Sequence, residues 1–215
     1  VSNVYVLTRP LYATSRLDET FESIESLVPL QSMSKAIVRG IDSPGPDVDD
    51  GVPYVRIAEM TGPEGILLSN LKRTSKKIAD EHPESCLVSG DIVVALRGVV
   101  GLPVRVPSEA EGANLSRGTA RVSVLNEHSS EYVYWALRSP RVRKEILRFA
   151  TGWKGEDLRE ITLKELRALR VPSLPRGKQE YVATTAEALA AAIRAATGRL
   201  VSASSLLRTF LNTAM

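Results

Sequence analysis

The sequence predicts an α+β protein, in which a mixed, mostly β domain over residues 1–174 precedes a long helix over residues 175–215. Short runs rich in valine and isoleucine, each bounded by Gly, Pro, Asn or Asp, predict β-strands between residues 52 and 125. An unbroken apolar heptad repeat near the C-terminus predicts the long helix. A length of 215 residues, with 43% hydrophobic and 25% charged side chains, allows one globular core plus an appendage.

The first 50 residues predict an irregular segment with one helix. Apolar residues from Leu17 to Leu27 recur with helical spacing. The stretch from Asp42 to Gly51 contains two prolines around Gly45, which predicts a loop. After this loop, strands are predicted over residues 53–58, 91–97, 102–106 and 119–125.

Three shorter helices are predicted over residues 130–138, 140–149 and 163–169. Ser129 and Ser130 are residues of the type that caps a helix N-terminus, and Pro140 suits the first position of the next helix. Thr162 is followed three residues later by Glu165, which is the pattern of a capping box. The chain from Val171 to Pro175 then leads into the long helix.

The C-terminal heptad repeat predicts a dimerisation or spacer helix. Its apolar positions alternate in steps of four and three, at Val182, Ala186, Leu189, Ile193, Ala196, Leu200, Ala203, Leu207, Phe210 and Ala214. A helix of about 36 residues would extend roughly 50 Å at ~1.5 Å per residue, farther than a small domain is wide. Alanine within this seam favours a close antiparallel pair of helices, whose contacts we expect at Val182, Leu189, Ile193, Leu200, Leu207 and Phe210. The alternative is a helix that packs along the core of its own domain.

The sequence lacks the patterns of three common kinds of catalytic or cofactor-binding site. The chain has no Asn/Asp-Pro-Pro-aromatic tetrapeptide of an amino-methyltransferase, no acidic residue two positions before a lysine and no phosphate-binding G-x-x-x-x-G-K-[ST] loop. Cys86 has no second thiol to pair with, and His82 and His128 lie far apart in the sequence. We therefore expect no catalytic residue, no metal and no cofactor in this chain.

Neither a membrane span nor a secretory signal is predicted. No run of 18 apolar residues occurs, and the first ten residues lack a basic region followed by a long apolar stretch. We expect a cytoplasmic protein that does not contact a membrane.

The charge distribution agrees with a nucleic-acid partner. The net charge is −4 over residues 1–50, +4 over residues 51–175 and +3 over residues 176–215. A pI near 9.1 fits nucleic acid, although many solvated surfaces are equally basic. One basic cluster, with polar residues interspersed, is suited to phosphate contacts and comprises Lys72, Arg73, Lys76 and Lys77. The alternative for this cluster is a solvated loop.

Three further places are suited to contacts with DNA bases. Arg97 follows an apolar strand and could read guanine, or else pair with a carboxylate. A glycine-flanked stretch between strands, which we predict to be a specificity loop, contains Asn114, Ser116 and Arg117. A turn with Trp153 and Lys154 could wedge an aromatic ring against the DNA, unless Trp153 anchors that turn in the core.

The order of these signals resembles a target-recognition domain, with its following helix, from the DNA-specificity subunit of type I restriction-modification systems. No single stretch is specific, but their order covers nearly the whole chain. The matching stretches are residues 16–18, 51–57 with the pattern G-x-P-x-[IV]-R, 90–94, 114–118, 131–139, 151–152, 158–169 and 170–175 before 178–180. The resemblance implies binding to double-stranded DNA without catalysis, in a complex with a DNA methyltransferase subunit.

The resemblance also implies a second specificity half. The usual subunit of this family carries two recognition domains and two long helices, whereas this chain shows one of each. A homodimer, or a pair with a second half, would restore the bipartite arrangement through antiparallel helices. Two alternatives remain open: a protein-interaction scaffold that does not bind DNA, and the specificity tail of a fused adenine methyltransferase.

Overall fold

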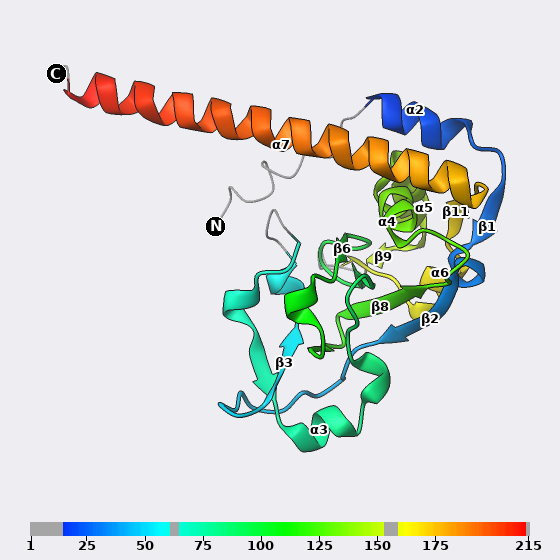
Figure 1. Cartoon of the computed structure of the whole chain (residues 1–215). Helices are drawn as coiled ribbons and strands as arrows, with labels where there is room; N and C mark the ends of the chain where they lie inside the picture. Colours follow the sequence, from blue (N-terminus) through cyan, green and yellow to red (C-terminus); the bar gives the residue numbers. More distant parts are fainter. Residues whose placement is uncertain (1–14, 61–64, 153–158, 214–215) are drawn as a thin grey trace.

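A computed structural model describes residues 15–60, 65–152 and 159–213 and has the predicted α+β class. A body of short strands and helices lies beside the long helix α7 (Arg176–Thr213), which extends well beyond it (Figure 1). In the described part of the chain, no helix is both long and apolar enough to cross a membrane.

The central sheet has four antiparallel strands. Its order is β2 (Ser34–Arg39), β8 (Thr119–Val124), β5 (Ile92–Ala95) and β6 (Pro103–Arg105). All four residues of β5 are buried, and they alternate between two apolar clusters. This alternation is the period of two that a strand imposes on its side chains.

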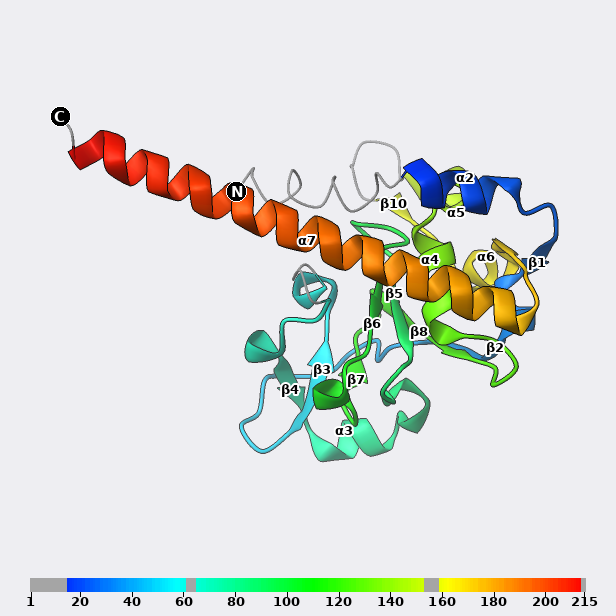
Figure 2. The same ribbon diagram turned by 45° about the horizontal axis from the view of Figure 1, so that its top comes forward.

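A second, three-stranded sheet lies at the end of the body away from α7 (Figure 2). Its middle strand β3 (Val52–Val55) runs antiparallel to β4 (Lys72–Thr74) and parallel to β7 (Asn114–Leu115). The short helix α3 (Lys76–Asp80) follows β4 directly. The four strands predicted from the sequence are present as β3, β5, β6 and β8, each with shorter bounds.

The predicted helix starts are confirmed. The Ser129 side chain accepts a hydrogen bond from the Tyr132 N–H at 3.2 Å and caps α4 (Ser130–Arg138). Ser139 caps α5 (Pro140–Phe149) in the same way. The capping box of Thr162 and Glu165 opens α6 (Leu163–Ala168).

The N-terminal part of the described chain is more regular than the sequence predicted. It contains α2 (Ser15–Ser23) and β1 (Leu27–Pro29), and then the edge strand β2 of the central sheet. β1 pairs with β11 (Arg170–Pro172), so that Leu27 lies opposite Pro172. The expectation of an irregular segment was wrong because the partners of these strands lie far away in the sequence. The smaller elements are β9 (Thr151–Gly152), β10 (Arg159–Glu160), η2 (Leu30–Met33), η3 (Ile57–Glu59), η4 (Leu68–Asn70), η5 (Pro83–Ser85) and η6 (Ser108–Ala110).

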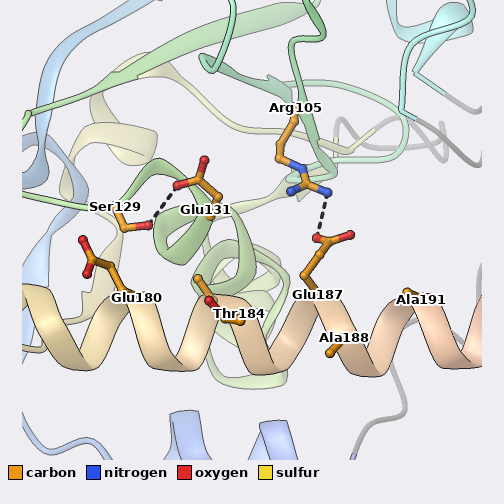
Figure 3. A pocket seen from close by; sticks show the side chains of 9 residues that line it. Arg105, Ser129, Glu131, Glu180, Thr184, Glu187, Ala188 and Ala191 are labelled. Atoms are coloured by element: carbon orange, nitrogen blue, oxygen red, sulfur yellow. Dashed lines mark hydrogen bonds and ion pairs between the residues drawn. The ribbon is translucent and has the colours of Figure 1, made fainter.

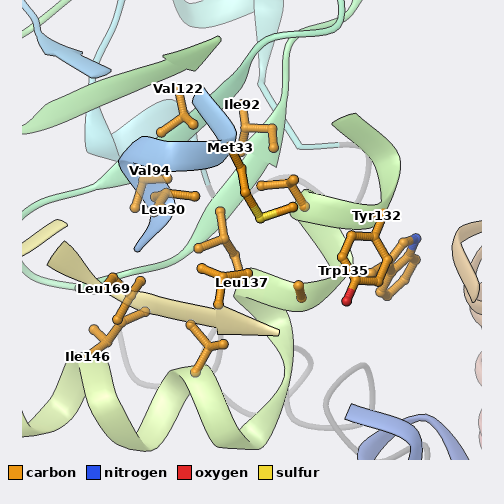
Figure 4. Packing of buried hydrophobic residues seen from close by; sticks show 14 of the residues in the cluster. Leu30, Met33, Ile92, Val94, Val122, Tyr132, Trp135, Leu137, Ile146 and Leu169 are labelled. Atoms are coloured by element: carbon orange, nitrogen blue, oxygen red, sulfur yellow. The ribbon is translucent and has the colours of Figure 1, made fainter. Parts of the chain in front are cut away.

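The larger apolar cluster fills the space between the central sheet and the helices. Side chains from β5, β8, α4 and α5 meet there (Figure 4). Trp135 is buried in it, as predicted. The smaller cluster lies between the two sheets and includes Val55, Val93 and Leu115.

The start of α7 belongs to the larger cluster. Val182, Ala183, Ala186 and Ala190 are buried there, where α7 packs along α4. The prediction that the dimer seam begins at Val182 is therefore wrong, because Val182 and Ala186 face the core of their own chain. For these positions the alternative, a helix packed on its own domain, holds. Farther along, Leu189 is 37% exposed and Leu200 is 69% exposed.

Candidate nucleic-acid interface

The predicted basic cluster forms one corner of the body, at the opposite end from α7 (Figure 2). Lys72 and Arg73 are exposed on β4, and Lys76 and Lys77 are exposed on α3. Ser75 lies between the two elements and caps α3, because its side chain accepts a hydrogen bond from the Ile78 N–H at 3.3 Å. The four cations therefore share one short stretch of surface.

An acidic loop, residues 42–51, lies along the outer edge of β4. The Arg73 N–H donates to Asp47 Oδ1 at 2.8 Å, and the Val48 N–H donates to the Arg73 carbonyl at 3.2 Å. The Thr74 hydroxyl donates to the Pro44 carbonyl at 2.6 Å. These bonds place the exposed carboxylates of Asp47, Asp49 and Asp50 next to the basic corner.

The four cations of the basic corner differ in their contacts: Arg73 bonds with the acidic loop, and the three lysines form no ion pair among the described residues. The Arg73 guanidinium donates to the Gly51 carbonyl at 2.9 Å and so helps to hold the loop. Among the ion pairs of the described residues, none engages Lys72, Lys76 or Lys77. The three lysines are therefore the members of the cluster that are free for phosphate contacts.

Arg117 is exposed on the tight turn between β7 and β8. The Ser116 N–H donates to the Val55 carbonyl at 2.9 Å, and the Thr119 hydroxyl donates to the Ser116 carbonyl at 2.8 Å. A Cβ at Gly118 would lie 2.7 Å from the end of the Ile57 side chain, so a larger residue there would displace Ile57. The turn is thus fixed on both sides while the guanidinium remains outside.

The charge of Arg117 acts on the carboxylate of a neighbouring ion pair. The hydrogen bond and the charge of Arg39 lower the pKa of the Asp42 carboxyl, and the charge of Arg117 contributes less to the same shift. Arg117 therefore lies within electrostatic reach of the pair between Arg39 and Asp42, which is itself exposed.

The prediction that Asn114 lies in an exposed specificity loop is wrong. Asn114 is 2% exposed in β7, and its Oδ1 accepts a hydrogen bond from the Ser85 hydroxyl at 2.5 Å. A buried amide with its oxygen bonded inside the protein cannot meet a base edge. Ser116 is half-buried, and its backbone forms a bridge with Ile41. Of the three predicted loop residues, Arg117 is the exposed one.

The remaining predicted DNA contacts lie elsewhere. Arg97 forms an ion pair with Glu160, with a 3.0 Å distance between guanidinium nitrogen and carboxylate oxygen. That pairing is the alternative that the sequence left open for Arg97. Trp153 and Lys154 lie outside the described residues. Within the described part of the chain, no cluster of His, Cys, Asp or Glu has a geometry that would hold a metal ion.

The seam positions of α7 fall on both sides of a boundary near Ala190. Ile193 is half-buried, while Leu189 and Leu200 are exposed. Leu207 and Phe210 lie in the helix, and their side chains are outside the described part. The unburied seam thus begins at Leu189, about two helical turns later than predicted.

The sequence did not reveal the residues that fix α7 to the body. Gln179 is completely buried, and Arg105 on β6 forms an ion pair with Glu187 at 2.9 Å. Glu180 and Glu187 of α7 line a groove of about 450 Å³ between the helix and the body, where Arg105 points at Glu187 (Figure 3). The available signal for Gln179 was its position three residues before Val182, where a polar side chain continues an apolar stripe.

Comparisons with known proteins agree with the resemblance. No family model matches the sequence. Over 84 residues, 39% of this chain and 17% of the relative, the sequence is 30% identical to the type I restriction enzyme EcoBI specificity subunit of Escherichia coli. The matched segment therefore spans less than a fifth of that relative's length.

Two solved structures share the fold. A structure of the type I restriction-modification system, described for complex assembly and conformational transition, matches with a TM-score of 0.65 and 16% identity, covering 97% of this chain and 55% of that chain. The HsdS subunit from Thermoanaerobacter tengcongensis matches with a TM-score of 0.60 and 17% identity, covering 90% of this chain and 45% of that chain. The chain spans about half the length of both structures. It is therefore similar, in sequence and in fold, to the specificity subunits of type I restriction-modification systems.

Proposed function

We propose that this chain recognises a DNA sequence for a type I-like restriction-modification system in the cytoplasm, without catalysis of its own. The observation that carries the proposal is the match of fold over 97% of the chain with a protein of such a system. The sequence similarity to a specificity subunit supports it. A partner methyltransferase subunit supplies the chemistry, and no cofactor is held by this chain.

Affinity and specificity reside on different side chains in this proposal. Lys72, Lys76 and Lys77 neutralise phosphates, which adds affinity for any duplex and makes binding depend on salt. Arg117 reads a base edge, because an arginine on a rigid turn can make two hydrogen bonds to guanine. The acidic loop limits the positive potential of the corner and so restrains binding to non-target DNA.

The free part of α7, from residue 191 to 213, pairs with a second copy of the chain or with another specificity half. An antiparallel pair of such helices would hold two recognition domains apart and let them read two half-sites. Each helical turn of about 5.4 Å changes that separation by between one and two base pairs at ~3.4 Å per step.

A scaffold that does not bind DNA is the second candidate. The specific observation that favours it is the row of carboxylates beside the basic corner, at Asp47, Asp49 and Asp50. In this alternative the body docks on another subunit, and the lysines are solvated.

Selection from a library of randomised duplexes separates the two candidates. The wild-type chain should recover a defined motif, and Arg117→Ala should relax one base pair of it at a cost of about 1–3 kcal/mol. The matched control is Arg148→Ala, which removes an exposed arginine from α5. Recovery of no motif by the wild type would overturn the proposal, and identical motifs from wild type and Arg117→Ala would remove Arg117 from the base contacts.

The salt dependence of binding tests the phosphate contacts. Replacing Lys72, Lys76 and Lys77 with alanine should weaken binding to all duplexes and flatten the log-log salt slope by roughly 0.9 per lost contact. The control removes three exposed lysines elsewhere, at Lys35, Lys164 and Lys178, and so loses the same charge. Equal slopes for the two triple variants would exclude the basic corner from the interface.

A further inference from the structure

The joint between the body and α7 is built around a buried amide. Gln179 Oε1 accepts a hydrogen bond from the Ser129 N–H at 2.8 Å, which identifies that atom as the oxygen. Its Nε2 therefore donates, to the Leu174 carbonyl at 2.7 Å and to His128 Nδ1 at 3.0 Å. One side chain thus satisfies three groups that lie just before α4 and just before α7.

A second contact lies two turns farther along α7. Arg105 reaches from β6 to Glu187, and its guanidinium also lies over the Tyr134 ring of α4, 4.7 Å from the ring centre. Arg194 donates to the other Glu187 oxygen at 3.1 Å. Burial raises the pKa of the Glu187 carboxyl, but the hydrogen bonds and charges of Arg194 and Arg105 outweigh it, so its pKa lies below the ordinary value.

Small apolar side chains pack α7 against the body beside the two contacts, next to the groove that Glu180 and Glu187 line. Val182, Ala183, Ala186 and Ala190 are buried against α4 and its neighbours, and alanine brings the two helices close together. A hydrogen-bonded amide at the start of the joint, an ion pair farther along it and small buried side chains thus hold α7 against the body. The body therefore fixes the direction in which α7 leaves it.

We propose that Gln179 and Glu187 are positioning residues, which set the angle of α7 and thereby the spacer length between the two DNA half-sites. This inference rests on the proposed DNA-recognition function. The free part of α7 from residue 191 to 213 extends roughly 35 Å, so a tilt of about 10° at the joint moves its end by about 6 Å. That displacement equals nearly two base-pair steps of ~3.4 Å.

The first experiment measures the joint itself and needs no DNA. Spin labels are placed at the exposed positions Ser108 and Ser202 in a Cys86→Ser background, and labelled chains are diluted with unlabelled ones. The wild type should give a narrow distance distribution. Gln179→Ala and Glu187→Ala should each widen or shift it, by about 3 Å for a tilt of about 10°, because residue 202 lies roughly 18 Å along the helix from Ala190.

The control and the milder variant keep this experiment decisive. Glu180→Gln is the control, because among the described residues Glu180 bonds with Arg176 on its own helix and does not cross the joint. Glu187→Gln is the milder variant, since both side chains of the Arg105–Glu187 pair are 38% exposed and the body should fold without the charge. We call the contacts of Gln179 and Glu187 with the body the clamp. A distance distribution that stays as narrow as that of the wild type in all joint variants would show that the clamp does not fix the angle of α7.

The second experiment measures spacer choice. Duplexes that contain two copies of the recovered half-site, separated by spacers of different lengths, are selected with each variant. The wild type and Glu180→Gln should choose one spacer length, whereas the joint variants should lose that preference and keep the half-site motif. An unchanged spacer preference with a widened distance distribution would overturn the positioning role. Recovery of no half-site by the wild type would instead refute the DNA function, while the distance measurement still reports on the clamp.

Discussion

The two parts of α7 have similar sequences and opposite surroundings. Residues 176–190 provide buried side chains to the core of the body, and residues 191–213 project beyond it (Figure 1). Both parts are rich in alanine and continue the same apolar repeat. The difference is the neighbour: α4 covers the first part, and in the described chain no element covers Leu200. An apolar heptad therefore predicts a partner without identifying it.

The largest expected effect comes from placing a charge in each part. Ala186→Asp should destabilise the chain by about 3–5 kcal/mol, because it buries an unpaired carboxylate in a site that is completely inaccessible. Ala195→Asp, at an exposed position of the projecting part that lies off the seam, should cost about 0.5 kcal/mol through helix propensity. Urea unfolding of both variants measures the contrast. Similar losses would mean that the boundary near Ala190 does not divide the helix.

A second pair of charges tests self-association. Leu189→Asp combined with Leu200→Asp should abolish a dimer while the body stays folded, because both positions are exposed in the isolated chain and lie on the seam. The control, Tyr181→Asp with Ala192→Asp, adds the same charges to exposed positions off the seam. Light scattering gives the masses. A monomeric wild type, or a double variant with unchanged mass, would refute self-pairing at this seam.

Local patterns predicted much of the fold. The capping box of Thr162 and Glu165 and the serine caps of α4 and α5 were recognisable because they depend on residues a few positions apart. What depended on distant partners was missed. β1 could not be predicted because Leu27 pairs with Pro172, and Asn114 seemed to lie in a loop because its strand β7 joins β3 from another part of the chain.

The candidate site, too, was predictable only where it depends on residues that are close together in the sequence. Composition identified the lysines of the basic corner, but the acidic loop that lies beside them became visible only when the backbone bonds of Arg73 were known. The structure buries Asn114 and exposes Arg117, so that only Arg117 can contact a base. The sequence carries no direct signal for this difference in exposure. The joint residues Gln179 and Arg105 were missed because their partners lie on α4, α7 and the segments before them.

Replacing a glycine with alanine in each part of α7 should have a moderate effect on the stability of the helix. A Cβ added at Gly177 or at Gly198 would meet no atom of another described element within 4 Å, so alanine fits at both positions. Gly198→Ala should stabilise the projecting part by about 1 kcal/mol and slow its amide exchange about fivefold. Gly177→Ala, in the first turn, should change little. Equal slowing of exchange over the whole of α7 would show that its two parts open together.

The smallest expected effect is the pH dependence of the clamp. Because the folded-state pKa of Glu187 is lowered, its contribution to stability is present above the ordinary glutamate pKa and is lost as the pH falls through the folded value. Glu187→Gln should therefore be slightly less stable than the wild type at neutral pH and equal to it in acid. Unfolding curves across this range test the sign, and a difference that grows on acidification would contradict it.

Hydrogen exchange at two protein concentrations tests most directly whether the two parts of α7 serve different partners. Amides from residue 176 to 190 should be protected to the same degree at both concentrations, because the chain's own core covers them. Amides from residue 191 to 213 should gain protection as the concentration rises and a second copy pairs with them. Protection of the projecting part that does not change with concentration, or that changes equally in both parts, would contradict this division.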